Sequence, residues 1–128
     1  FSSISIENVI IEKSNNDCID LSSGNYDIEK IKINLCGDKG ISIGEKASFY
    51  SNDVKITSTN FGVASKDSSI SKFNNLLIEN SHTCLSAYRK KQEFSGGVLE
   101  VNNLNCKNYI NKNEFDKKSK IKVHNEII

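Results

Sequence analysis

The chain has 128 residues, 37% hydrophobic and 26% charged, and this length suits one domain with a single core. Its 17 Lys and Arg residues nearly balance its 16 Asp and Glu residues, and a net charge of +1 argues against a nucleic-acid-binding protein. No apolar run approaches the roughly 20 residues that cross a bilayer, so no membrane span is predicted.

Three short strand-like pieces with alternating polarity follow one another in each part of the chain, and Gly, Asn, Asp and Ser residues that suit turns separate them. They lie at 4–6, 9–11 and 18–21, then at 26–28, 31–33 and 40–43, then at 49–50, 54–56 and 62–65, and then at 70–73, 76–78 and 84–87. The third pieces begin 22 residues apart each time, and a fixed period of this size is typical of a solenoid. Alternation places four of their apolar residues in one inward column, Ile19, Ile41, Val63 and Leu85.

This pattern predicts an all-β, right-handed parallel β-helix with 22-residue coils, three short strands per coil and about five coils. The absence of Pro agrees with a continuous backbone ladder. We expect one β-helix domain over residues 1–128, with four regular coils in 1–97 and an irregular last coil and C-terminal cap in 98–128. Since Phe1 leads almost directly into the first strand, we expect further coils or another domain to precede this piece.

The four cysteines are predicted to be unpaired. Cys18 and Cys84 share one column three coils apart, a separation of about 14 Å, which is too long for a disulfide. Cys36 falls in a turn and Cys106 in the last coil, and no C-x-x-C pair suggests a metal site. We therefore expect no structural disulfides and no metal, and free thiols weakly oppose an extracellular location.

Three segments from successive coils carry a family resemblance: 36–46, 62–69 and 87–97. Together they resemble the right-handed β-helix repeat module of bacterial surface and envelope proteins, in particular the module that accompanies CotH-type kinase-like domains. The resemblance covers roughly residues 4–106 and implies an envelope-associated or extracellular structural module. The kinase-like part is absent from this chain, and no catalytic motif of the related polysaccharide-acting enzymes is found.

One corner of the predicted coils carries charged residues in stacked columns. Glu45 and Asp67 are predicted on adjacent rungs about 5 Å apart, and Arg89 is predicted on the next rung. The neighbouring columns add Lys66, Tyr88 and Lys90. Paired carboxylates at this distance are typical of retaining glycosidases, and a carboxylate beside a basic residue suits a lyase. A solvated ladder of alternating charge is the plain alternative.

Asp17, Asp20 and Asp38 carry oxygen ligands that could bind Ca²⁺, but alternation points Asp20 outward whereas Asp17 and Asp38 lie near the turn. We expect these carboxylates to cap turns, so no metal or other cofactor is predicted.

The leading functional hypothesis is a noncatalytic β-helix scaffold or recognition module that binds polysaccharide. Its ligand-binding residues are predicted to be Glu45, Lys66, Asp67, Tyr88, Arg89 and Lys90. The alternative is a fragment of a carbohydrate-active enzyme, a polysaccharide lyase or glycoside hydrolase. Its catalytic residues would be Glu45, Lys66, Asp67 and Arg89.

Overall fold

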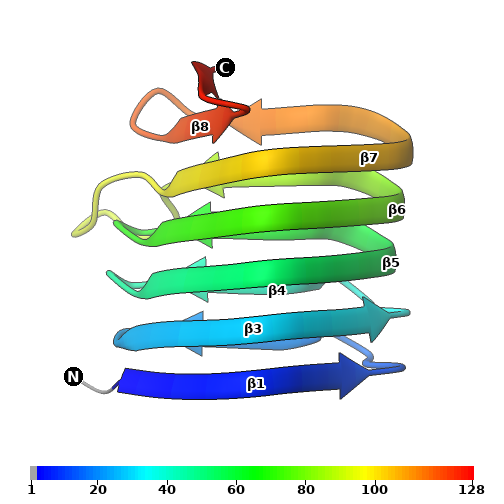
Figure 1. Ribbon diagram of the computed structural model, residues 1–128. Coiled ribbons are helices and arrows are strands. Elements are labelled where there is room, and N and C mark those ends of the chain that lie inside the picture. Colours follow the sequence, from blue (N-terminus) through cyan, green and yellow to red (C-terminus); the bar gives the residue numbers. More distant parts are fainter. Residues whose placement is uncertain (1–2) are drawn as a thin grey trace.

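The computed structural model describes residues 3–128 and contains strands but no helix over that range. The strands are β1 (Ser3–Ile11), β2 (Ile19–Ser22), β3 (Asn25–Asn34), β4 (Lys39–Gly44), β5 (Ser48–Lys66), β6 (Ile70–Tyr88), β7 (Val98–Phe115), β8 (Lys120–Val123) and β9 (Glu126–Ile127). All pair in parallel with the next coil except β9, which pairs antiparallel with β8. Figure 1 shows the coils stacked one above another. The predicted parallel β-solenoid is therefore confirmed. Phe1 lies outside the described residues, and the expected preceding coils stay a prediction.

Each coil has a front face and a back face. The front face is formed by β1, β3, β8 and the first halves of β5, β6 and β7, whereas β2, β4 and the second halves of the long strands form the back (Figure 1). The long strands turn from front to back near Ser58, Asn80 and Asn108, whose φ angles are 60°, 59° and 55°. Such left-handed conformations cost little at Asn and allow the chain to turn without leaving the ladder.

The front face bends in the middle. In β5, Phe49 and Ser51 are buried, and the next buried residues are Val54 and Ile56, so two consecutive residues between them face outward. This break divides the front of each coil into two segments, which with the back strand make the three expected pieces. In β5, β6 and β7 the pieces join into one continuous strand.

Stacked amides stabilise this bend. The side-chain Nδ2 of Asn52 donates to Oε1 of Glu29 at 2.8 Å, and Asn74 donates to Asn52 at 2.7 Å. Asn102 continues the row by donating to Asn74 at 3.2 Å. An amide carries both donors and an acceptor, so identical Asn side chains on successive rungs satisfy one another.

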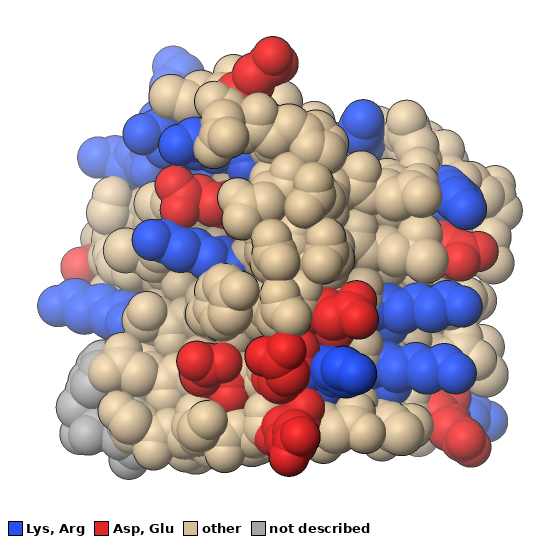
Figure 2. Space-filling model, viewed as in Figure 1, with Lys and Arg blue, Asp and Glu red and all other residues tan. Residues whose placement is uncertain are grey.

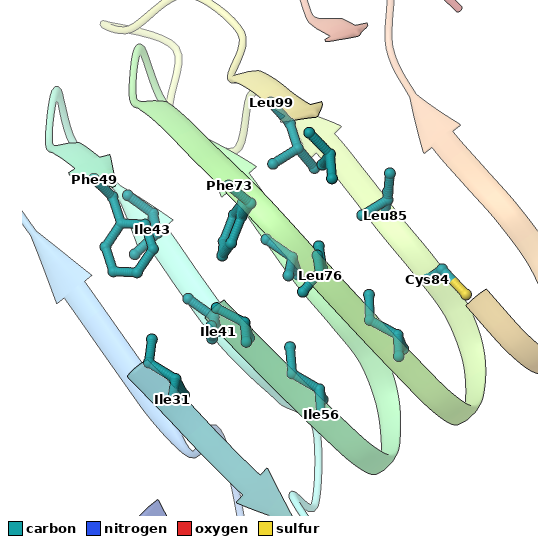
Figure 3. Packing of buried hydrophobic residues seen from close by; sticks show 14 of the residues in the cluster. Ile31, Ile41, Ile43, Phe49, Ile56, Phe73, Leu76, Cys84, Leu85 and Leu99 are labelled. Atoms are coloured by element: carbon teal, nitrogen blue, oxygen red, sulfur yellow. The ribbon is translucent and has the colours of Figure 1, made fainter. Parts of the chain in front are cut away.

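The core lies between the two faces, where front and back side chains meet (Figure 3). The predicted inward column is confirmed: Ile41, Val63 and Leu85 are fully buried. The rings of Phe49 and Phe73 contact each other in a tilted arrangement, with centroids 5.3 Å apart. Burying each side chain of this size contributes about 1.5–3 kcal/mol to folding.

The largest change in the spacing between coils comes after Leu85. Along the back face Ile19, Ile41, Val63 and Leu85 keep the 22-residue step, but Leu85 pairs with Asn113, 28 residues later. The six added residues lie in segment 89–97, and β7 stays paired with β6 as far as Phe115. With β8 the front face has six rungs.

The prediction of no structural disulfides is wrong. Cys18 pairs with Cys36 and Cys84 with Cys106, with Cα–Cα distances of 5.4 and 6.5 Å. We compared cysteines within one column, whereas the true partners occupy different positions in neighbouring coils, 18 and 22 residues apart. Two residues that are about one coil apart in the sequence lie close together when both are near the same corner of the stack. Each bridge therefore joins one coil to the next.

Replacing Cys18 and Cys36 together by Ser is expected to lower the free energy of unfolding by about 3 kcal/mol, because a bridge over this length restricts the unfolded chain. Urea denaturation of the oxidised wild type and of the double variant measures the difference. Thiol titration of the denatured wild type serves as the control and is expected to detect no free thiol. Equal unfolding midpoints would contradict the prediction.

Candidate functional site

The predicted charged corner exists as a set of stacked turns. Ser23, Glu45 and Asp67 all have left-handed φ angles, of 51°, 45° and 53°. The Ser23 hydroxyl donates to the carbonyl oxygen of Glu45 at 3.2 Å, and the N–H of Lys46 donates to the carbonyl oxygen of Asp67 at 2.9 Å. Backbone contacts between successive turns thus place these residues one above another.

The carboxylate of Asp67 is buried and accepts hydrogen bonds from the protein's own backbone. Asp67 is only 1% exposed, and its Oδ1 accepts the backbone N–H groups of Lys90 and Lys91 at 2.7 and 2.9 Å. Both donors belong to the long segment 89–97. Asp67 therefore fixes the beginning of this loop, and its carboxylate faces the loop's backbone instead of solvent.

Glu45 meets a different partner. Its carboxylate pairs with the ammonium group of Lys91, a residue that the sequence analysis did not select. The hydrogen bond from this ammonium group to Glu45 raises the pKa of Lys91. Arg89 is exposed, and its backbone N–H donates to Oδ2 of Asp116 at 2.8 Å. The loop is thus tied to the coils on both sides of it.

Lys66 and Tyr88 lie half-buried at the end of the back face. The Lys66 stem covers Gly44 on the preceding coil, where an added Cβ would lie 3.2 Å from Cε of Lys66. Burial raises the pKa of Tyr88, and nearby Lys39 opposes that rise. Within residues 3–128, no ion pair joins Lys66, Arg89 or Lys90 to Glu45 or Asp67.

Two of the acidic residues considered for Ca²⁺, Asp17 and Asp38, lie beside a lysine. The Lys39 ammonium lies 2.8 Å from Oδ2 of Asp38 and 3.9 Å from Oδ1 of Asp17, and it stands over the Phe61 ring at 5.9 Å. The hydrogen bond from Lys39 lowers the pKa of Asp38. Asp20 is exposed on β2, and the described residues contain no cluster of three or more metal-binding side chains.

A groove that the sequence analysis missed crosses the front face. Two adjoining hollows of about 450 and 210 Å³ share Asp53, Val54 and Leu77, and together they extend from β1 to β7. One wall is the column Asn8, Lys30, Asp53, Asn75 and Asn103. The other wall is the column Ile10, Lys32, Lys55, Leu77 and Asn105. We call this feature the front groove.

The front groove runs along the stacking direction. Its walls follow five successive rungs, which span about 19 Å at the usual spacing of neighbouring strands. The columns were hidden in the sequence by one extra residue in the turn 45–47, so Lys32 pairs with Lys55 at a step of 23, not 22. The strand pieces themselves were predicted, and aligning them would have revealed the columns.

Comparison of the sequence with protein-family models found no match, and neither did comparison with curated proteins or with solved structures. The structure itself shows the β-solenoid of stacked coils that the family resemblance implied. Its finer part, the link to bacterial surface proteins and CotH-type domains, has no further support and remains a proposal.

Replacing Asp67 by Ala is expected to lower the free energy of unfolding by about 2 kcal/mol, because two N–H groups of the loop lose their acceptor. Hydrogen exchange at Lys90 and Lys91 is expected to become faster. The matched control is Glu45→Ala, which removes only a solvent-screened ion pair with Lys91 and is expected to lower the free energy of unfolding much less. Urea denaturation compares the two variants, and equal losses would contradict the structural role of Asp67.

Proposed function

We propose that this protein is a noncatalytic recognition module that binds a linear polysaccharide along its front face. The observation that carries the proposal is the front groove, an open channel that crosses five coils with equivalent positions on each rung. A polymer of repeating units suits such a surface, because every coil offers it the same backbone spacing.

The chemistry of the walls agrees with a glycan. Asn75, Asn103 and Asn105 offer amide donors and acceptors, which complement sugar hydroxyl groups. Leu77 supplies apolar contact in the middle of the channel. A third hollow of about 380 Å³ on the same face contains the exposed ring of Tyr50 beside Asn25 and Asp27. An aromatic ring beside polar groups is a surface on which a sugar ring can stack.

A noncatalytic role is favoured over the enzyme alternative by the state of the predicted acids. Asp67 is buried and holds two backbone N–H groups, and Glu45 is paired with Lys91. A catalytic carboxylate has to reach the substrate within hydrogen-bond distance, and Asp67 faces the loop instead. The lyase or hydrolase alternative therefore has less support than binding alone.

An extracellular setting is supported by the disulfides. Both bridges are of the kind that forms in oxidising compartments, so the predicted objection from unpaired cysteines no longer holds. Among the described residues no helix capable of crossing a membrane is present. Association with a bacterial envelope rests on the resemblance and belongs to the same proposal.

A panel of neutral and acidic bacterial and plant polysaccharides tests the function. We expect at least one to raise the melting temperature saturably, because a ligand that binds only the folded state adds about 2.7 kcal/mol at a hundredfold excess over its Kd. Leu77→Asp, placed in the groove, is expected to abolish the rise, and Lys117→Asp outside it to preserve the rise. Assays for new reducing ends and unsaturated products are expected to stay at background.

The absence of a thermal shift across the panel would contradict the proposal. A shift that Leu77→Asp leaves unchanged would contradict the placement of the ligand in the front groove. Product formation that Glu45→Gln abolishes would favour the enzyme alternative.

A further inference from the structure

The front groove contains an uncompensated pair of positive charges. Lys32 on β3 lies directly beside Lys55 on β5, and like charges on neighbouring strands, about 5 Å apart, destabilise a sheet. Both side chains are exposed, and Figure 2 shows basic side chains one above another on this face. Within residues 3–128, neither lysine takes part in an ion pair.

Neither neighbour in the same column offers a counter-charge. Ile10 pairs with Lys32 from below, and Leu77 pairs with Lys55 from above, so both column neighbours are apolar. Lys30 adds a third positive charge in the other wall, beside Asp53. The larger hollow thus contains three lysines and one aspartate, a net charge of +2, with apolar contacts at both ends.

Other polar side chains stacked on the front face pair with one another. At the bend, Asn52, Asn74 and Asn102 occupy successive rungs and bond to one another. Lys72, also on the front face, has Glu100 on the adjacent rung at 3.6 Å. Among the described residues, Lys32 and Lys55 form neither a hydrogen bond with each other nor an ion pair with an adjacent rung. Their two ammonium groups are therefore free to bind an external anion.

We propose that Lys30, Lys32 and Lys55 form a subsite for the acidic groups of the polysaccharide, so that the ligand is a linear polyuronate or a similarly anionic glycan. The inference rests on the proposed function and names the charge class of its ligand. Carboxylates carried on a chain in the front groove would lie between the two stacked ammonium groups and relieve their repulsion. Leu77 and Ile10 would contact the apolar faces of the neighbouring sugar units.

The decisive variant is Lys55→Glu, which replaces the repulsive pair by an attractive one without disturbing the core. Because the introduced carboxylate would face Lys32, we expect an unchanged or higher melting temperature in the absence of ligand. A lower melting temperature would overturn the premise that the lysine pair is unfavourable. The matched control is Lys117→Glu, which changes the net charge equally but lies outside the groove.

The probes are polygalacturonate and its methyl-esterified, uncharged counterpart, with binding measured by calorimetry at low and high salt. We expect tighter binding of polygalacturonate, weakening as salt increases, and a loss of about tenfold or more for Lys55→Glu but not for Lys117→Glu. Equal affinity of wild-type protein for both probes, or equal effects of the two variants, would overturn the acidic subsite.

The outcomes also separate this inference from the proposed function. Binding of the methyl-esterified probe that Leu77→Asp abolishes and Lys55→Glu leaves intact would preserve polysaccharide recognition and reject the acidic subsite. Absence of binding by either probe and by every other member of the panel would reject both.

Discussion

The parallel backbone ladder is the constraint on which the rest of this structure depends. Each strand donates to and accepts from the coil below and the coil above, so every coil has to return to the same place after one turn. A residue then has a fixed neighbour one coil away, and similar residues form columns whatever their chemistry. In the core, columns of Ile, Val and Leu form a continuous apolar interior. On the surface the same rule stacks amides, hydroxyls and charges.

Sequence reasoning worked where the columns are apolar and the step is constant. Ile41, Val63 and Leu85 could be aligned because the back face keeps 22 residues per coil and alternation assigns each an inward direction. It was less successful at corners, where insertions are tolerated because they lie outside the ladder. The turn 45–47 gains one residue and segment 89–97 gains six, without interrupting the pairing on either side. When such an insertion lies between two coils, the residues of a surface column cannot be aligned with a single constant period.

The charged corner shows a second limit. The sequence placed Glu45 and Asp67 at equivalent positions of successive turns, and the backbone agrees. Their side chains nevertheless differ completely in environment, since the loop 89–97 supplies two N–H donors to Asp67 and the ammonium group of Lys91 to Glu45. A column predicts neighbours one coil away but not the path of an inserted loop that folds over it. The disulfides were missed for a related reason, since their partners lie at different positions of adjacent coils.

In stacked coils, the charges of neighbouring surface residues can indicate where a charged ligand would bind. A lone surface lysine is solvated at little cost, but a ladder places it beside the residue one coil away, and two lysines there repel each other. In two other places on the front face the neighbours are complementary, in the Asn row at the bend and in Lys72 with Glu100. Lys32 and Lys55 depart from that arrangement in the part of the face that is hollowed. An unfavourable pair inside a groove is the arrangement that an anionic ligand would stabilise, because the ligand supplies the counter-charge that the column neighbours Ile10 and Leu77 do not.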